Sequence, residues 1–371
     1  MSRVTRRQAV AAILVAGMAR ADDTVSVPGK KPMLLHNDRP EDLETPPEYF
    51  RSWLTPNDAF YVRQHLPRPK VNGESYRLSV NGKVSKPLTL NLDDLRKLPQ
   101  FEVPATMECA GNGRAFFRPR VPGSQWTRGA IGNAAWRGPR LADILKLAGF
   151  DAAAGFVEFD GVDQGAVSTP DFVRSFPMKK MLHPATLLAL QMNGEALPDL
   201  HGFPCRLIVP GWVGACWVKW VQRITVSETP NTGFFMNPAY RFPRYNLPPG
   251  APAKPDELDM IQGMAVKSII MEGKAGTVSG IAWAGEERVE RVEVSTDGGM
   301  HWTDAALSKE NLPFAWRLWN YAWKPSKRGY YTVLSRATDS AGRVQPFEAV
   351  WNPSGYAWNA VDKIGILVEH V

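Results

Sequence analysis

Cysteine is scarce in this chain, because only Cys109, Cys205 and Cys216 occur among its 371 residues. Three thiols cannot form a disulfide framework, and the absence of CxxCH and paired CxxC motifs excludes covalent haem, zinc ribbons and iron–sulfur clusters held by such pairs. A hydrophobic core must therefore hold the fold together, and 44% hydrophobic residues with 13 tryptophans suffice for about two domains. We expect Cys205 and Cys216 to be buried thiols, with a disulfide between them left open.

Long hydrophobic runs are also absent, since no segment approaches the roughly 20 apolar residues that cross a bilayer. The short apolar run at residues 9–19 follows Arg6-Arg7 and ends at the small-x-small pattern of residues 19–21. This pattern predicts a signal peptide at residues 1–21 of the twin-arginine type, which exports proteins already folded around a cofactor. An ordinary secretory signal or a non-cleaved anchor is the alternative. We therefore expect a periplasmic or otherwise exported protein without a membrane span.

Excess charge of one sign is small once that signal is set aside. The formal net charge is +7, and the four arginines of residues 1–21 account for four of these charges, which leaves +3. No run of lysines or arginines occurs in the rest of the chain. We therefore expect an ordinary solvated surface and no nucleic-acid partner.

The first part of the chain mixes helices and strands. Alternating apolar residues at 76–80 run into Asn81-Gly82, which predicts a strand that ends in a tight turn. Apolar residues at 141, 144, 145 and 148 have helical spacing and stop at Gly149, which predicts a short amphipathic helix. The proline-rich residues 246–255 suit neither regular element, so we place a domain boundary there, between residues 22–245 and 246–371.

The second part of the chain reads as strands and turns. Val292 and Val294 alternate with polar residues up to the Asp-Gly-Gly turn at residues 297–299, and a further β-rich segment covers residues 330–338. Short strands separated by glycine turns predict a β-sandwich of immunoglobulin type.

One thiol lies in an unusual setting. Cys109 is followed by Gly111, Gly113 and Arg114, so that small residues let backbone approach whatever the sulfur contacts and an arginine favours the thiolate that binds metals. This arrangement would offer a single sulfur ligand to a bulky cofactor. A small buried cysteine in a tight turn is the structural alternative.

Several ordered blocks accompany this motif. They are residues 60–65, 107–114, 129–136, 192–194, 201–206, 210–214, 218–220 and 295–302. Together they resemble the sulfite oxidase family of molybdenum enzymes, and particularly its bacterial sulfite dehydrogenases, over nearly the whole mature chain. The resemblance implies an α+β protein, with a mixed α/β molybdopterin-binding domain followed by an immunoglobulin-like dimerisation domain, and hence a homodimer.

The resemblance also implies a cofactor and the residues that hold it. In this family a molybdopterin gives two sulfurs to molybdenum, and the protein adds a cysteine, here Cys109, as metal ligand. A soft thiolate suits such a metal. The implied cofactor-binding residues are Tyr61, Val62, Arg63, Gln64, His65, Cys109, Asp163, His201, Arg206, Trp217, Val218 and Lys219. Cationic side chains for a phosphate and one carboxylate for ring donors suit a pterin.

The implied catalytic residues surround an oxyanion pocket. Arg63 and Arg114 would bind the anion, and Tyr240, whose usual pKa is about 10, would stay protonated and donate a hydrogen bond. His65 would add a polar contact, and Trp126 resembles the pocket tryptophan of the family. Each of these residues is predicted to be catalytic.

The chain departs from the animal and plant members at a few positions. Ser354 stands in place of an arginine, Ala239 replaces an acid before the tyrosine, and Gln64 replaces an asparagine. Loss of the arginine removes one pocket charge and leaves the identity of the oxyanion open. Nothing resembles the cytochrome b5-like haem domain of the animal enzymes, so the electrons are expected to pass to a separate c-type cytochrome.

The predicted function is molybdenum-dependent oxidation of sulfite or a related small oxyanion. One alternative is an oxotransferase of the same fold that acts on a sulfoxide or another oxyanion. A second is acyl or thiol transfer by Cys109 as a nucleophile paired with His65 or His201, without molybdenum. A third is an exported binding protein without enzymatic activity, in which the Cys109 turn is structural.

Overall fold

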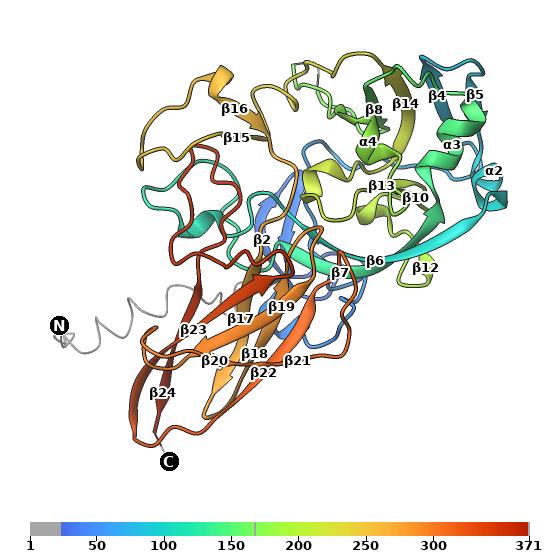
Figure 1. Ribbon diagram of the computed structural model, residues 1–371. Helices are drawn as coiled ribbons and strands as arrows, with labels where there is room; N and C mark the ends of the chain where they lie inside the picture. The colour runs from blue at the N-terminus through green and yellow to red at the C-terminus, as the bar shows by residue number, and fades with distance from the viewer. Residues whose placement is uncertain (1–23, 167, 370–371) are drawn as a thin grey trace, which may run out of the picture.

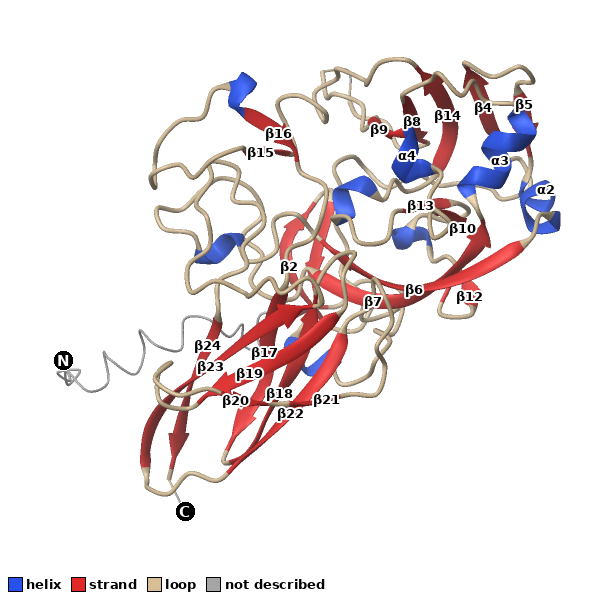
Figure 2. Cartoon of the chain, in the orientation of Figure 1, coloured by secondary structure: helices blue, strands red, loops and turns tan. Residues whose placement is uncertain are grey.

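The computed structural model describes residues 24–166 and 168–369, so the predicted signal peptide lies outside the described residues. Figure 1 shows two bodies, a mixed N-terminal domain in blue to yellow and an elongated β-sandwich in orange to red. Strands greatly outnumber helices, as Figure 2 makes plain.

A long antiparallel hairpin lies between the two bodies (Figure 1). It consists of β6 (Gln100–Glu108) and β7 (Ile131–Pro139), and it continues into the short strands β11 (Gln191–Met192) and β12 (Glu195–Ala196). The last four residues of β6 are buried without alternation, because protein covers both faces of the hairpin at that end. Cys109 follows the hairpin strand at this doubly covered end.

A five-stranded sheet forms the far side of the N-terminal domain. Its order is β5 (Leu88–Leu90), β4 (Leu78–Gly82), β14 (Val221–Ser227), β8 (Phe156–Gly161) and β9 (Arg174–Pro177). Only β4 and β14 pair in parallel. A second set of short strands lies nearer the centre: β10 (Leu187–Ala189) pairs with β13 (Arg206–Ile208).

The remaining elements outside the sandwich are short. The α-helices are α2 (Leu92–Lys97), α3 (Leu141–Ala148) and α4 (Met178–Met181). The 3₁₀ turns are η2 (Pro47–Tyr49), η3 (Arg114–Phe116), η4 (Asp199–His201), η5 (Gly214–Cys216) and η6 (Pro255–Glu257). The other strands are β1 (Thr24–Val25), β2 (Met33–Asp38), β3 (Glu41–Glu44), β15 (Arg241–Pro243) and β16 (Leu258–Met260).

Two four-stranded sheets form the sandwich. One has the order β17 (Lys267–Lys274), β18 (Gly276–Trp283), β22 (Arg317–Trp323) and β21 (Ala306–Leu307). The other has the order β20 (Thr303–Asp304), β19 (Val289–Ser295), β23 (Gly329–Asp339) and β24 (Asp362–Val368). Buried and exposed residues alternate along β24, as expected of a strand with one face on a core.

The two cores meet at the hairpin. The main hydrophobic cluster of the N-terminal domain includes Trp283 and Trp316 of the sandwich. The indole of Trp316 donates to the carbonyl of Trp53 at 2.7 Å, and the indole of Trp53 donates to the carbonyl of Trp316 at 3.1 Å. This reciprocal pair fixes the sandwich against the N-terminal domain.

Most of the local predictions from the sequence are confirmed. Helix α3 is followed directly by Gly149, which caps its C-terminus. Gly149 has a left-handed backbone with φ of 62°, a conformation that glycine adopts without steric cost. Strands β19 and β23 occupy the predicted strand segments, and residues 244–254 contain no helix or strand. The strand predicted from residue 76 begins instead at Leu78, and Asn81 and Gly82, predicted as its turn, still belong to β4 because they pair with β14. Cys205 and Cys216 are buried free thiols, so no disulfide joins them.

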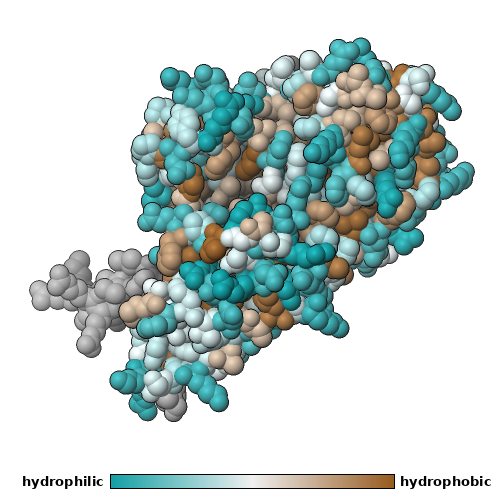
Figure 3. Space-filling model, in the orientation of Figure 1, coloured by the Kyte–Doolittle hydropathy of each residue, from teal (hydrophilic) through white to brown (hydrophobic). Residues whose placement is uncertain are grey.

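The surface carries no dominant apolar face in the view of Figure 3, where brown residues are scattered in small groups among teal ones. Among the described residues, no helix has both the length and the apolar character needed to cross a bilayer.

Candidate functional site

One cavity brings together most of the residues predicted for the site. The predicted residues that line it are Tyr61, Val62, Arg63, Gln64, His65, Cys109, Asp163, His201, Arg206, Trp217, Lys219 and Tyr240. Sequence analysis missed the other lining residues, which are Met107, Phe172, Leu200, Gly214, Ala215 and Trp220. Val218, Arg114 and Trp126 do not line the cavity.

The turn after β6 holds Cys109 at the cavity wall. Its backbone N–H donates to the carbonyl of Ala130 at 2.9 Å, and its own carbonyl accepts from the N–H of Asn112 at 2.9 Å. Burial raises the pKa of the Cys109 thiol, whereas Arg114 and Arg63 act in the opposite direction. Without a metal, burial therefore outweighs the effect of Arg114 and favours the protonated thiol. A metal reverses this, since a coordinated thiol is deprotonated.

Glu108, directly before the cysteine, anchors the turn to the sandwich. Its carboxylate accepts from Asn112 Nδ2 at 3.0 Å, Lys267 Nζ at 3.1 Å and Trp283 Nε1 at 2.9 Å. Lys267 and Trp283 belong to β17 and β18. The position of Cys109 therefore depends on the second domain, and no local signal in the sequence indicated this.

The two glycines of the turn make room for side chains of the protein itself. A Cβ atom on Gly111 would lie 2.6 Å from the guanidinium of Arg114. Gly113 has φ of +88°, and a Cβ atom there would lie 2.5 Å from the indole of Trp358. Close packing by Arg114 and Trp358 is thus one physical reason for glycine at these positions.

Arg114 lies behind the turn and is buried. Its Nε donates to the carbonyl of Ser354 at 3.2 Å, and its Nη1 donates to the carbonyl of Ser124 at 3.0 Å. The guanidinium lies 5.3 Å from the ring of Tyr356. Arg114 is near enough to Cys109 to affect its pKa, while its predicted contact with an anion stays a prediction.

Arg63 lines the cavity and is 29% exposed at its side chain. Its Nη1 donates to Asp42 Oδ1 at 3.0 Å, and Ser124 Oγ donates to Asp42 Oδ2 at 2.5 Å. Asp42 is buried in β3 and also accepts from the backbone N–H of Gln64. Sequence analysis missed Asp42, although it lies in the acidic segment of residues 41–44 that could have drawn attention.

Tyr240 and His65 form a hydrogen-bonded pair at the cavity. The His65 ring stacks on Phe172 with centroids 4.2 Å apart. Burial lowers the pKa of His65 well below its usual range, and the nearby cations Arg63, Lys219 and Arg174 lower it further. Burial raises the pKa of Tyr240 well above its usual value. Both groups are therefore neutral at physiological pH.

His201 has an unforeseen partner in Lys30. The Lys30 ammonium lies 2.6 Å from His201 Nε2 and donates to the carbonyls of Asn57 at 2.7 Å and Phe60 at 2.8 Å. Burial lowers the pKa of Lys30 to about 7, although Asp58 opposes the shift. No motif surrounds Lys30, so nothing in the sequence indicated this contact.

Arg206, Lys219 and Asp163 supply charge deep in the cavity. Burial lowers the pKa of Arg206 to about 10, and burial with the repulsion of Arg206 lowers that of Lys219. Burial raises the pKa of Asp163 to about 6, against the attraction of Lys219. Arg206 donates to the carbonyl of His201 at 3.0 Å and to Met107 Sδ at 2.9 Å. Arg206 is thus held by a backbone carbonyl and a sulfur acceptor, and Lys219 Nζ donates to the carbonyl of Leu200 at 3.3 Å.

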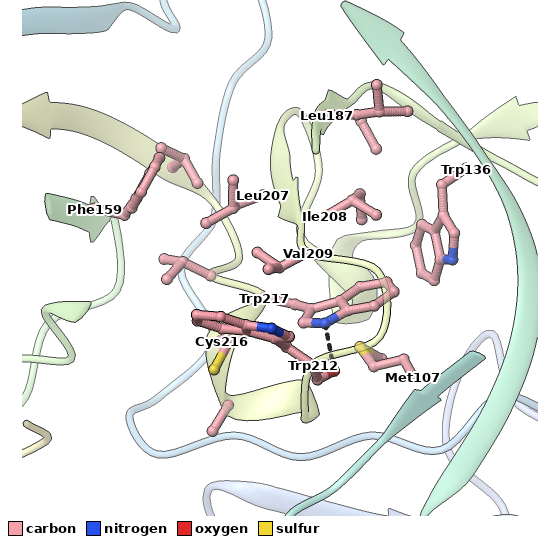
Figure 4. Packing of buried hydrophobic residues seen from close by; sticks show 14 of the residues in the cluster. Met107, Trp136, Phe159, Leu187, Leu207, Ile208, Val209, Trp212, Cys216 and Trp217 are labelled. Carbon is pink, nitrogen blue, oxygen red and sulfur yellow. Dashed lines mark hydrogen bonds between the residues drawn. The ribbon is translucent and has the colours of Figure 1, made fainter. Parts of the chain in front are cut away.

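Two of the predicted tryptophans have structural contacts. Figure 4 shows Trp217 packed among Trp136, Trp212 and Met107, with its indole donating to the carbonyl of Trp212 at 3.0 Å. Trp126 is fully buried between His36 and Tyr61 and has no hydrogen-bond partner on Nε1 among the described residues. The structure does not place Trp126 on the cavity wall.

The donor set fits a metal that is brought in by an organic cofactor. Within residues 24–166 and 168–369, no group of three or more His, Cys, Asp or Glu side chains could hold a metal ion. One soft sulfur ligand, the thiol of Cys109, is present instead, and it completes a site only if other ligands come from elsewhere. Arg206 Nε and Gln64 Oε1 are buried in the cavity region without a hydrogen-bond partner among the described residues. A polar ligand such as a pterin would satisfy them.

Comparisons with known proteins define the class as a molybdopterin-dependent oxidoreductase. The oxidoreductase molybdopterin binding domain family matches residues 65–235, and the Mo-co oxidoreductase dimerisation domain family matches residues 259–369. The cofactor is therefore molybdenum bound to molybdopterin.

The chain belongs to the sulfite oxidase family. It is 35% identical to mitochondrial sulfite oxidase of Rattus norvegicus over 369 residues, which are 92% of this chain and 67% of the rat protein. It is also 35% identical to sulfite oxidase of Arabidopsis thaliana over 351 residues, covering 84% of this chain and 88% of the plant protein. The crystal structure of the sulfane dehydrogenase SoxCD from Paracoccus pantotrophus aligns with a TM-score of 0.76 and 30% identity, covering 89% of this chain and 87% of the other.

Proposed function

We propose that this molybdoenzyme oxidises sulfite to sulfate and passes the two electrons singly to an external c-type cytochrome. We further propose that it is exported by the twin-arginine route and acts as a homodimer. The names of the animal and plant relatives support the choice of sulfite, and the dimerisation domain supports the dimer.

The convergence of Cys109, Arg63 and Tyr240 on one cavity carries the proposal. A small oxyanion that leaves water needs a cation and hydrogen-bond donors within reach. Arg63 offers both, and Asp42 fixes its guanidinium by an ion pair at 3.0 Å without filling every donor. Cys109 provides the attachment for the metal at the same cavity.

Tyr240 and His65 together supply a directed hydrogen bond. If neutral His65 carries its proton on Nε2, it donates to Tyr240 Oη, and the phenol proton is then free to bond an anion in the cavity. The opposite tautomer would direct that proton to His65 and away from substrate. We therefore assign the Nε2–H tautomer to the active protein.

When bound, the cofactor supplies the oxygen atom that sulfite gains and accepts the two electrons that it loses. Arg206, Lys219 and His201 would hold its anionic part, and Asp163 would accept from its ring donors. The protein's further contribution is to exclude water, because most of these groups are buried.

A steady-state assay tests the proposal. Protein purified from a host that makes molybdopterin should contain molybdenum and oxidise sulfite with cytochrome c or ferricyanide as acceptor. Cys109→Ser should keep the fold, judged by circular dichroism, and lose turnover and bound molybdenum. Reduction of a sulfoxide without sulfite oxidation would instead establish the oxotransferase alternative. Protein free of metal from such a host would contradict both.

A further inference from the structure

A buried arginine outside the predicted site lies directly behind Tyr240. Arg174 begins β9, an edge strand of the five-stranded sheet (Figure 2), and its side chain is fully buried. Its Nη1 donates to the carbonyl of Phe235, within the segment that leads to Tyr240. Arg174 does not line the cavity, so any effect on a ligand must pass through a neighbour.

The guanidinium carries a charge that no carboxylate balances. Among the described residues, Arg174 has no ion pair, and its Nε and Nη2 have no oxygen or nitrogen acceptor. The Cys216 thiol lies near the guanidinium of Arg174. Burial raises the pKa of this thiol, and the nearby Arg174 acts in the opposite direction. An unpaired buried cation is costly to keep, which points to a use for its charge.

Arg174 belongs to a continuous series of contacts between two cations. Its Cζ lies 5.0 Å from the ring centroid of Tyr240, and that ring stacks on Tyr356 at 5.4 Å with an interplanar angle of 8°. Arg114 Cζ lies 5.3 Å from the Tyr356 ring at the other end. The phenol of Tyr240 thus lies against a desolvated positive charge, a setting in which a cation attracts ring electrons strongly.

We propose that Arg174 is a positioning residue for the anionic substrate: its unpaired charge draws electron density from the Tyr240 phenol and so strengthens the hydrogen bond that Tyr240 donates to an oxyanion in the cavity. The inference rests on the proposed function for the identity of that oxyanion. The electrostatics agree, because burial raises the pKa of Tyr240 and Arg174 opposes the rise. A phenol made more acidic is a better donor.

Binding of sulfate to the resting holoenzyme tests this inference without turnover. Arg174→Gln can still donate to the carbonyl of Phe235 but lacks the charge, so the Kd of sulfate should rise about tenfold. Arg174→Lys keeps the charge at a pH low enough to protonate the buried lysine, and there it should bind sulfate as the wild type does. The matched control is Arg223→Gln, which removes a half-exposed arginine from β14. It should leave the Kd of sulfate unchanged.

Two further measurements separate the charge from a structural role. A buried lysine loses its proton at a lower pH than arginine does. Sulfate affinity should therefore fall with rising pH in Arg174→Lys but not in the wild type. The titratable groups that face the side chain at position 174 are Tyr240, Cys216 and His65, and they are the same in both proteins. This arm remains decisive if the glutamine variant does not fold. In a Tyr240→Phe background, Arg174→Gln should cause no additional loss.

Unchanged sulfate affinity in folded Arg174→Gln, or pH-independent affinity in Arg174→Lys, would overturn the inference. Failure of the proposed function gives a different result. In that case sulfite would not be oxidised, yet the anion-binding differences among these variants would persist.

Discussion

Replacing Glu108 by glutamine tests how far the metal site depends on the junction between the domains. The carboxylate of Glu108 pairs with Lys267 at 3.1 Å, and the two side chains are only 10% and 4% exposed. Glu108→Gln keeps the size and one acceptor but leaves the Lys267 ammonium without its counter-charge. Breaking a buried pair in this way should lower the free energy of unfolding by about 3–5 kcal/mol.

The double variant provides the internal check. Lys267→Met alone leaves the Glu108 carboxylate unpaired and should cost a similar amount. Glu108→Gln combined with Lys267→Met removes both charges, while the single glutamine oxygen can still accept from one of Trp283 and Asn112, which donate to different carboxylate oxygens of Glu108. The double variant should therefore lose only about 1–3 kcal/mol, less than either single variant. Urea unfolding of the four proteins measures these differences.

Molybdenum content should follow the same order, because Glu108 directly precedes Cys109. We expect a reduced metal-to-protein ratio in each single variant and recovery in the double variant. Glu272→Gln disrupts an exposed ion pair with Lys274 and should change neither property. Losses that simply add in the double variant would refute the assignment of Glu108 and Lys267 as one electrostatic unit.

Three further outcomes follow from single contacts. Gly113→Ala should lower the free energy of unfolding by about 2–4 kcal/mol, because the new methyl group meets the Trp358 indole and the residue has positive φ; thermal or urea unfolding measures this. Lys30→Met removes all three contacts of the Lys30 ammonium, one of them to a cavity residue, and should reduce bound molybdopterin in released-pterin assays. The pKa of His65 is lower in the folded than in the unfolded protein, so the free energy of unfolding should decrease as pH falls below about 6.5. This group contributes up to about 1.4 kcal/mol per pH unit. His65→Gln should therefore make the free energy of unfolding depend less steeply on pH in this range.

Each of these outcomes has a matched control. Gly194→Ala tests the cost of a positive φ alone, since nothing lies within 4 Å of the added methyl group. An equal decrease in the free energy of unfolding at this position would show that contact with Trp358 adds nothing at Gly113. Lys31→Met removes the adjacent lysine, 40% exposed at its side chain, and should leave the pterin content unchanged. His301→Gln removes an exposed histidine from its pair with Asp297, a contact that solvent screens, and should alter the acid transition less than His65→Gln does. An equal effect at His301 would contradict the assignment to burial.

Local elements were predictable because their signals lie within a few residues. The apolar spacing of residues 141–148 and Gly149 define α3, since helix period and a left-handed C-terminal residue are local properties. Alternation likewise predicted β19, and a run of β-rich residues before a glycine turn predicted β23. The thiol at Cys109 and the ordered blocks around it were sufficient for the family and the cofactor.

The partners that fix the site were not predictable in the same way. Lys30 and His201 are 171 positions apart, and Glu108 and Lys267 are 159 positions apart. Neither pair leaves a periodic pattern or a motif, and each forms only because the folded chain brings distant segments together. Arg174 gave no signal either, as one arginine in a strand resembles any other until its burial is known.

The sequence by itself determined the elements, the division into a mixed part and a strand-rich part, and the single sulfur available to a metal, because these depend on residue type and short-range order. Tertiary structure alone decided which charges are buried, which cations have counter-charges, and which side of the Cys109 turn Arg114 occupies. Burial changes the cost of a charge through the loss of water, and that loss depends on every segment that packs around the group.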